Sequence, residues 1–217
     1  MINNAHVEPG GATYTEELSA DVRLTKFSVG SMDNNCYLLE HSDGSSILID
    51  AAAEPGRIAR VVGDAGPDVV ITTHRHHDHV GALAAIVESR GPRAVAGVDD
   101  VAEIERQTGV SGTEPVQHGD AIAAGSLSLE VIQLVGHTPG SIALVFDGRV
   151  LFTGDSLFPG GPGKTSTPAD FSSLMDHLTE RIFDRFGDDV VVHPGHGDST
   201  TLGVERPHLA EWRARGW

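Results

Sequence analysis

The hydrophobic and polar positions of this chain follow the pattern of short strands interleaved with short helices. Residues 22–27 alternate apolar and polar side chains, which is typical of a half-buried strand. The segment 116–153 is expected to be mostly β, because glycines at turn positions divide its apolar runs. Short apolar runs predict further strands at residues 36–39, 46–50, 69–71, 94–96 and 190–192.

Apolar residues at helical spacing predict the helices. They are expected to start at Pro55 and to cover residues 80–87, 101–106, 168–186 and 205–215. The longest has the clearest start, since Thr167 offers a hydroxyl cap, Pro168 stands in the first turn and Asp170 follows. Its apolar stripe comprises Phe171, Leu174, Leu178, Ile182 and Phe186. Such a stripe predicts that one side of this helix is buried.

Strands and helices alternate without a low-complexity linker, which predicts a single domain over residues 21–217. The order β-rich, helical, β-rich, helical indicates two similar α/β halves. Residues 1–20 are polar and interrupted by glycine and proline, so they are expected to form a loose leader. Neither a secretory signal nor an apolar stretch long enough to span a bilayer is found, so a cytoplasmic protein is expected.

Composition and charge exclude several kinds of function. The chain has 217 residues, of which 39% are hydrophobic, and this is enough for a buried core. Its formal net charge is −16, which repels phosphate groups, so binding to nucleic acids or to anionic membranes is not expected. The one cysteine, Cys36, excludes an intrachain disulfide and is interpreted as a buried apolar residue of a strand.

The candidate chemistry lies in a cluster of histidines and aspartates. The run from His74 to His79 is His-Arg-His-His-Asp-His, and later fragments place His137, Asp155 and His196 beside glycine or proline. Turns of this kind hold metal ligands on a rigid scaffold. Imidazole nitrogen and carboxylate oxygen, without thiolate, suit zinc, iron or manganese. The pattern therefore predicts a hydrolytic site with two metal ions.

Spacing within the run divides these ligands between two ions. His74 and His76 lie two positions apart, so on an extended turn both can reach the same ion. Asp78 and His79 are adjacent and are expected to point elsewhere, toward a second ion. The zincin motif His-Glu-x-x-His is excluded, because Arg75 stands where the glutamate is needed.

These residues resemble the metallo-β-lactamase-fold superfamily, whose mark is His-x-His-x-Asp-His. The resemblance covers roughly residues 22–210. It implies an α/β fold of the αββα four-layer sandwich type. It also implies seven metal ligands: His74, His76 and His137 on a first ion, Asp78, His79 and His196 on a second, and Asp155 bridging both.

The chemistry that the resemblance implies is hydrolysis with two divalent ions, most readily zinc, with iron or manganese as alternatives. The ions lower the pKa of a shared water toward ~7, and the metal-bridging hydroxide attacks a carbonyl carbon. Asp78 is the candidate catalytic residue. Asp50 matches a recurrent acid of the fold and is expected to orient a ligand, with a turn cap as the alternative. In true β-lactamases of this fold the position of Asp155 is not an aspartate, which disfavours antibiotic hydrolysis.

The segment 154–165 is similar to a loop of the hydroxyacylglutathione hydrolases, or glyoxalase II enzymes, and of their short bacterial relatives. Lys164 stands where that family has a basic residue for a substrate carboxylate, with a solvated surface lysine as the alternative. The resemblance implies a small anionic thioester as the substrate. Two departures leave the carrier thiol open. Ser166 replaces an expected aromatic residue, and the sequence after His196 is too short for the C-terminal helical domain of the full-length enzymes.

Other functions share parts of this motif. A persulfide dioxygenase would use one iron, bound by His74, His76, His137 and Asp155. A hydrolase of other esters or of lactones would use the full ligand set. A nuclease of the same fold is disfavoured by the acidic charge, and a non-catalytic binding module is disfavoured by the seven intact ligands.

Three further residues near the motifs are given structural interpretations. His77 occupies a variable position of the motif and is expected to be exposed. His193 is expected to support the neighbouring turn rather than bind an ion. Arg206 is expected to form a salt bridge with Glu205 or with another acid. The oligomeric state is left open.

Overall fold

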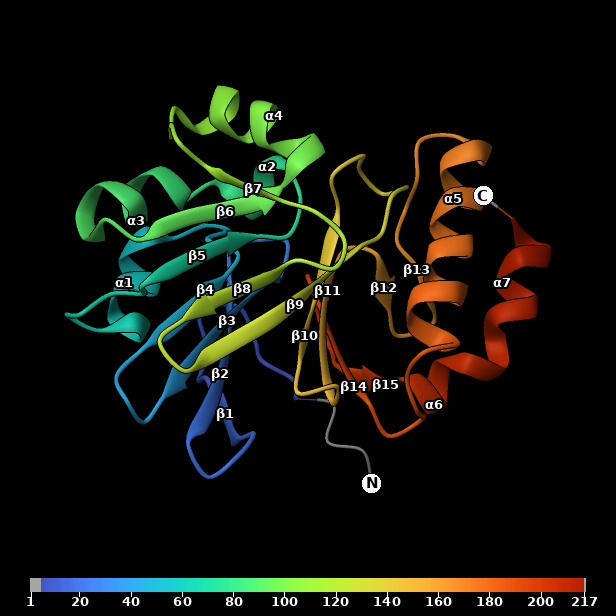
Figure 1. Ribbon diagram of the computed structural model, residues 1–217, viewed down its shortest axis with the longest axis horizontal. Helices are drawn as coiled ribbons and strands as arrows, with labels where there is room; N and C mark the ends of the chain where they lie inside the picture. The colour runs from blue at the N-terminus through green and yellow to red at the C-terminus, as the bar shows by residue number, and fades with distance from the viewer. Residues whose placement is uncertain (1–4, 217) are drawn as a thin grey trace.

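The computed structural model describes residues 5–216, in which two β-sheets lie face to face with helices on their outer sides (Figure 1). Seven strands form the first sheet and follow one another across it in chain order. They are β1 (Tyr14–Glu17), β2 (Val22–Val29), β3 (Asn34–His41), β4 (Ser46–Ile49), β5 (Val69–Thr72), β6 (Arg93–Gly97) and β7 (Glu114–Val116).

The second sheet has six strands. They are β8 (Ala121–Ala124), β9 (Leu127–Gln133), β10 (Ile142–Phe146), β11 (Val150–Gly154), β14 (Val191–Pro194) and β15 (Thr200–Thr201). Their order across the sheet is β15-β14-β11-β10-β9-β8. A separate short hairpin follows β11 and consists of β12 (Leu157–Phe158) and β13 (Gly161–Pro162).

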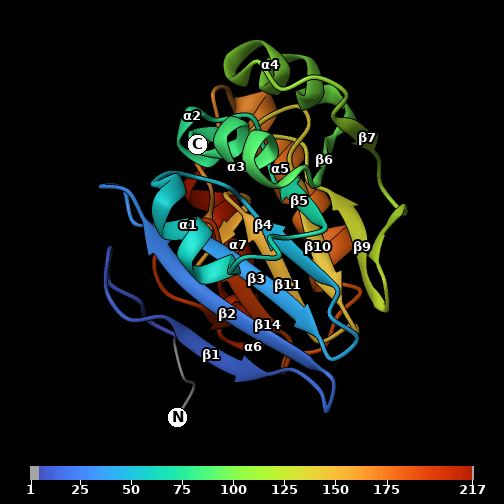
Figure 2. The same cartoon turned by 90° about the vertical axis from the view of Figure 1, so that its left-hand side faces the viewer.

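Helices cover the outer face of each sheet. Figure 2 shows three of them over the first sheet, namely α1 (Pro55–Val62), α3 (Leu83–Arg90) and α4 (Val98–Thr108). Over the second sheet lie α5 (Pro168–His177), the π-helical η1 (Leu178–Phe183) and α7 (Leu209–Arg215). The short helices are α2 (His77–Val80), α6 (Leu202–Glu205) and η2 (Arg206–His208). Within residues 5–216, every helix is too short or too polar to cross a membrane.

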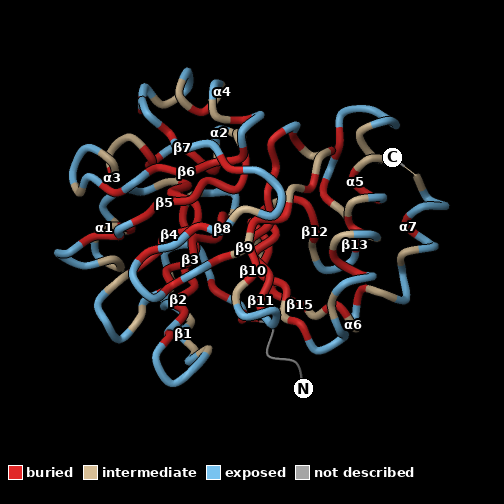
Figure 3. The backbone as a smooth tube through the Cα atoms, in the orientation of Figure 1, coloured by how far each residue is buried: buried red, intermediate tan, exposed pale blue. Residues whose placement is uncertain are grey.

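Three hydrophobic clusters fill the spaces between these four layers, and buried backbone follows the strands (Figure 3). Because neighbouring side chains of a strand point to opposite faces, β4 contributes to two clusters. Ile47 and Ile49 face the second sheet, whereas Leu48 joins Ile58 of α1 on the helical side. Trp212 belongs to the cluster between the second sheet and its helices. The predicted αββα four-layer sandwich is confirmed.

Strand direction brings several loops to one edge of the sandwich. Strands β4, β5, β6 and β7 are mutually parallel, and β11 is parallel to β14. The carboxyl ends of β5, β11 and β14 are Thr72, Gly154 and Pro194, and predicted metal ligands follow each of them closely. Polar side chains can converge there because loops at strand ends are held by a rigid sheet.

Part of the expected leader, residues 1–20, belongs to the fold instead. Tyr14–Glu17 forms the edge strand β1, which pairs antiparallel with β2. Ala5 and Val7 are buried. The polar composition misled the prediction because an edge strand needs apolar side chains on one face only. Residues 1–4 and Trp217 lie outside the described residues.

The longest predicted helices are interrupted. The helix from Pro168 is α-helical only to His177 and continues as η1, where the Asp184 amide donates to the Thr179 carbonyl over 2.8 Å. This wider turn changes the helical phase, so Phe183 is buried while Phe186 is partly buried. The segment 205–215 is divided among α6, η2 and α7 at a proline, which cannot donate a helical hydrogen bond.

Candidate metal centre

The structure brings all seven predicted ligands together at the edge where β5, β11 and β14 end. They come from the segment after β5 (His74, His76), the helix α2 (Asp78, His79), the loop between β9 and β10 (His137), the end of β11 (Asp155) and the end of β14 (His196). Each half of the sandwich therefore contributes side chains to one site.

The first group of ligand atoms belongs to His74, His76 and His137, and these atoms all lie within 4.8 Å of one another. The rings of His74 and His76 meet edge to face with centroids 4.7 Å apart, and those of His76 and His137 do so at 4.5 Å. The carboxylate of Asp155 closes this group. Its Oδ2 lies 4.0 Å from His74 Nε2 and 3.6 Å from His137 Nε2.

The second group belongs to Asp78, His79 and His196, whose ligand atoms also lie within 4.8 Å of one another. His196 Nε2 lies 3.4 Å from Asp78 Oδ2 and 3.2 Å from His79 Nε2. Asp155 faces this group as well, with Oδ1 3.3 Å from His79 Nε2 and Oδ2 3.3 Å from His196 Nε2. The carboxylate of Asp155 thus stands between both groups.

These distances and donors fit divalent metal ions. A tetrahedral ion with bonds of about 2.0–2.1 Å holds neighbouring ligand atoms about 3.4 Å apart. Among the described residues, His74 Nε2, His137 Nε2 and Asp155 Oδ1 are buried and lack a hydrogen-bond partner. A buried polar atom without a partner costs about 1–3 kcal/mol, and a bound cation would satisfy all three.

Hydrogen bonds orient three of the imidazole rings. In each, Nδ1 faces an acceptor, so an Nδ1–H that donates there leaves Nε2 for an ion. The acceptors are Asp50 Oδ2 for His79 (2.8 Å), the Lys164 carbonyl for His137 (2.6 Å) and the Met32 carbonyl for His196 (2.7 Å).

Asp50 both faces a predicted ligand and caps a turn, the two roles that were expected as alternatives. Besides facing His79, it accepts hydrogen bonds from the backbone N–H and from the hydroxyl of Thr73, each over 2.8 Å. Its backbone φ is 57°, and its side chain is buried. The carboxylate of Asp50 therefore holds in place both the turn before His74, which follows the end of β5, and the ring of His79.

Burial and neighbouring charges shift the pKa values of His79, His74 and Asp155 away from their usual values. Burial disfavours protonated His79, but the carboxylates of Asp50 and Asp155 outweigh it and raise the pKa of His79 to about 10. Burial, reinforced by His79, lowers the pKa of His74 well below its usual value. Burial also opposes the charge of Asp155, yet His196 and His79 hold the pKa of this carboxyl well below its usual range. Asp155 is therefore ionised at neutral pH and attracts positive charge.

Sequence reasoning missed Asn34, which lies at the start of β3. Its side chain is buried, and its Nδ2 donates to Asp78 Oδ2 over 2.9 Å. Its backbone also bridges to His196. A carboxylate oxygen has two lone pairs, so Asp78 Oδ2 can accept this hydrogen bond and still bind an ion. Two consecutive asparagines at the start of a buried strand were the available signal.

Alanine at position 34 is expected to weaken one of two bound ions. Asn34→Ala removes the donor that orients Asp78, and the loss of such a partner typically costs 10–100-fold in metal affinity. A competitive chelator titration of Asn34→Ala should show one weakened ion. The group of His74, His76 and His137 serves as the internal control, because Asn34 does not contact it. Two unchanged affinities would contradict this role of Asn34.

The remaining predicted residues lie as follows. Lys164 is exposed, and its carbonyl rather than its ammonium contacts the centre. The side chain of His77 is 83% exposed, as expected. His193 is buried, with Nδ1 2.7 Å from the Ser199 hydroxyl, which agrees with a structural role. Arg206 forms the expected salt bridge, with its Nε 2.6 Å from an oxygen of Asp188.

Comparison with known proteins identifies the class to which this fold and site belong. The metallo-beta-lactamase superfamily matches residues 29–196, and the chain belongs to that superfamily. Hydroxyacylglutathione hydrolase GloC of Haemophilus influenzae is 28% identical over 196 residues, which cover 82% of this chain and 92% of the relative. A hydroxyacylglutathione hydrolase of Anaeromyxobacter dehalogenans is 33% identical over 165 residues, and 61% of its own length is covered.

Solved structures agree with this assignment. ETHE1 from Myxococcus xanthus superposes with a TM-score of 0.75 at 28% identity, covering 88% of this chain and 84% of that protein. TTHA1623 in a di-iron-bound form superposes with a TM-score of 0.68 at 29% identity, covering 82% and 95%. BLEG-1, a B3 metallo-beta-lactamase, is 24% identical with a TM-score of 0.73, so it is similar in fold alone.

Proposed function

We propose that this protein is a hydrolase that uses two divalent metal ions to cleave acyl thioesters with an anionic carrier thiol. The observation that carries the proposal is the pair of three-residue ligand groups with Asp155 between them. Relatives named hydroxyacylglutathione hydrolase support a thioester as the substrate. We propose zinc as the metal, with iron or manganese as alternatives for the same donors.

The mechanism assigns separate tasks to the residues of the centre. Two divalent ions held by these residues would supply Lewis acidity and a water of lowered pKa. The carboxylate of Asp155 faces both ligand groups, with Oδ1 near His79 and Oδ2 near His137 and His196, and can hold the groups at a fixed separation. Asp78 Oδ2 lies between Asn34 and His196 and would hold an ion there, and we assign to the other carboxylate oxygen of Asp78 the proton that the attacking water loses. A thiolate with a pKa of about 8.5 can leave without a strong general acid.

The proposal is tested by counting metal ions and then by measuring turnover. Purified protein should contain two equivalents of metal by elemental mass spectrometry, and it should hydrolyse at least one member of a thioester panel with several carrier thiols. Esters and lactones belong in the same panel. Turnover of lactones but not of thioesters would be consistent with the proposed metal centre but would contradict thioesters as the substrate class.

A one-iron dioxygenase is the alternative function, because His74, His76, His137 and Asp155 could hold one ion by themselves. The ligand atoms of Asp78, His79 and His196 favour two ions instead, since they also lie within 4.8 Å of one another. One equivalent of iron, with oxygen uptake in the presence of a thiol persulfide, would replace the hydrolase proposal with this alternative.

Lys164→Ala is expected to raise KM for anionic thioesters severalfold and to leave the metal content unchanged. Only the backbone carbonyl of Lys164 contacts His137, so the variant keeps that hydrogen bond and loses the ammonium. An exposed charge contributes on the order of 0.2–1 kcal/mol, which sets the modest size of the effect. Steady-state kinetics on anionic and neutral thioesters measures it. Equal losses on both substrates would remove the proposed role of Lys164.

A further inference from the structure

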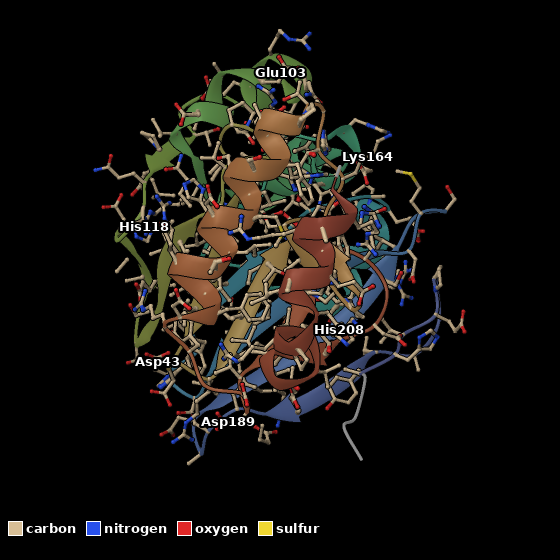
Figure 4. All side chains as sticks on the ribbon, turned by 90° about the vertical axis from the view of Figure 1, so that its right-hand side faces the viewer. Asp43, Glu103, His118, Lys164, Asp189 and His208 are labelled. Atoms are coloured by element: carbon tan, nitrogen blue, oxygen red, sulfur yellow. The ribbon has the colours of Figure 1, made fainter. Side chains whose placement is uncertain are left out.

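Asp100 is a buried carboxylate outside the ligand set, in the first turn of α4. Its side chain is fully buried, and the sequence patterns did not single it out. Figure 4 shows Glu103 of the same helix near the end of the molecule where Lys164 lies, whereas Asp189 lies near the other end. Because the Lys164 carbonyl contacts His137, α4 lies at the edge of the sandwich that carries the metal centre.

Asp100 contacts the segment after β5, between the two ligands of that segment. Its Oδ2 accepts a hydrogen bond from the Arg75 amide over 3.1 Å, and its Oδ1 lies 3.5 Å from Arg75 Nε. Further along α4, the Gln107 side chain donates to the Arg75 carbonyl over 3.0 Å. Arg75 separates His74 from His76 in the sequence. Helix α4 therefore holds the backbone between two predicted ligands at both its amide and its carbonyl.

The same carboxylate contacts the loop between β9 and β10, which carries His137. Asp100 Oδ2 accepts from the Thr138 hydroxyl over 2.5 Å, and Oδ1 accepts from the Gly140 amide over 3.1 Å. A Cβ at Gly140 would lie 2.4 Å from the Asp100 backbone nitrogen, and one at Gly97 would lie 2.0 Å from the Gly140 carbonyl oxygen. The start of α4 and this loop therefore meet backbone to backbone.

These two loops belong to different halves of the sandwich. His74 and His76 follow β5 of the first sheet, whereas His137 precedes β10 of the second sheet. Among the described residues, every polar contact of Asp100 is made with one of these two loops. One carboxylate thus joins the two parts of the first ligand group.

The second ligand group is held by other partners. Asn34 donates to Asp78, and the Met32 carbonyl faces His196 Nδ1. Neither contact involves Asp100. A change at Asp100 should therefore act on the two ligand groups unequally, which separates a positioning role from a general role in stability.

The donors around Asp100 require a carboxylate. Two backbone amides and one hydroxyl converge on it, and the two oxygens of a carboxylate can accept all three hydrogen bonds. An asparagine has a single acceptor oxygen and presents donor hydrogens in place of the other, so at least one converging donor would lose its partner. A buried donor without a partner costs free energy, so the loops would move apart to reach other acceptors.

We propose that Asp100 is a positioning residue of the first metal site, which fixes the separation of His137 from His74 and His76 and so determines the affinity for the ion that these three would hold. Ligands bind an ion tightly when their positions are fixed before it arrives. The inference rests on the metal centre of the proposed function and is independent of the substrate.

The test is a competitive chelator titration with zinc. Asp100→Asn should weaken one of two bound ions about 10–100-fold and leave the other unchanged. Combining it with Asn34→Ala, which removes the partner of Asp78, identifies the ion. The combined variant should bind both ions weakly if the two residues serve different ions. One ion of wild-type affinity in the combined variant, or equal weakening of both ions by Asp100→Asn alone, would overturn the proposal.

The matched control is Asp99→Asn, which removes the same charge from the neighbouring, exposed position in the same turn of α4. Both zinc affinities should stay at their wild-type values in this control. If Asp99→Asn and Asp100→Asn weakened the same ion equally, the effect would come from the lost charge at the start of α4, and the assignment to the contacts of Asp100 would be wrong.

A second pair of variants tests the same contact without changing Asp100. Thr138→Val keeps the shape of the side chain but removes the hydroxyl that donates to Asp100, whereas Thr138→Ser keeps the hydroxyl. Thr138→Val should weaken the first ion severalfold, and Thr138→Ser should restore nearly wild-type affinity. Equal affinities in these two variants would contradict the proposal even if Asp100→Asn failed to fold.

The outcomes for this inference and for the proposed function can be told apart. Thioester turnover by the wild-type protein, with unchanged zinc affinities in Asp100→Asn and Thr138→Val, would contradict the positioning role and be consistent with the thioesterase. The expected affinity pattern without turnover of any thioester would support the positioning role and contradict the thioesterase. A wild-type protein with a single ion that weakens in Asp100→Asn, but not in Asp99→Asn, would support the positioning role and contradict the two-ion mechanism.

Discussion

Asp155→Ala is expected to lose both metal ions and, with them, all measurable thioester hydrolysis. Oxygens of Asp155 lie 3.3–4.0 Å from Nε2 atoms of the histidines in both ligand groups. Partners that only orient a ligand already contribute about 10–100-fold to metal affinity, so the loss of a shared ligand should weaken both ions by more than about 100-fold. Metal content after gel filtration and turnover of the preferred thioester measure the two effects.

The control for Asp155→Ala is Asp147→Ala, in the turn between β10 and β11, where the replaced side chain is 68% exposed. This control loses the same charge and should retain both ions and full activity. If Asp155→Ala kept one ion at wild-type affinity, Asp155 would serve a single ligand group. If it kept both, the carboxylate would not be a ligand.

Gly195→Ala is expected to have the second-largest effect, although position 195 carries no functional group. A Cβ built there would lie 2.1 Å from Asp155 Oδ1 and 2.8 Å from His79 Cε1. The backbone cannot move away easily, because the Gly195 amide donates to the Gly154 carbonyl and its own carbonyl accepts from the Asn35 amide, each over 2.8 Å. The methyl group must therefore displace two of the predicted metal ligands, Asp155 and His79.

The expected result for Gly195→Ala is a Tm lower by about 3–10 °C, since overpacking costs about 1–3 kcal/mol in a chain of this size. Metal content and turnover should fall with it. Gly56→Ala is the matched control, because a Cβ at Gly56 in α1 meets only Arg60 Nη1 at 3.9 Å. Alanine there should leave Tm unchanged or raise it slightly. Wild-type metal binding by Gly195→Ala would show that the centre tolerates displacement.

Local patterns predicted most strands, and the family resemblance implied the sandwich, but neither indicated the helix interruptions or the role of the N-terminal segment. Periodicity reports only which face of an element is buried, so a helix that changes phase at Leu178 and an edge strand at Tyr14–Glu17 gave no separate signal. The two halves expected from the order of elements correspond to the two sheets with their outer helices.

The predicted ligands were identifiable because imidazoles and carboxylates beside glycine and proline are chemically distinctive wherever the chain places them. The groups that orient them were not. The carbonyls of Met32 and Lys164 fix His196 and His137, and every residue type has a carbonyl. Asn34 belongs to a residue type that is common on any chain, so only its position gives it a role.

The sequence by itself determined which side chains are candidate metal ligands, the alternation of strands and helices, and the acidic charge, because these depend on residue chemistry and on neighbours along the chain. Only the tertiary structure decided that Asp155 stands between two ligand groups and that His196 lies beside Asp78. The physical reason is that both arrangements depend on how the two sheets and their outer helices pack. That packing joins residues that are distant in the sequence and that share no local pattern.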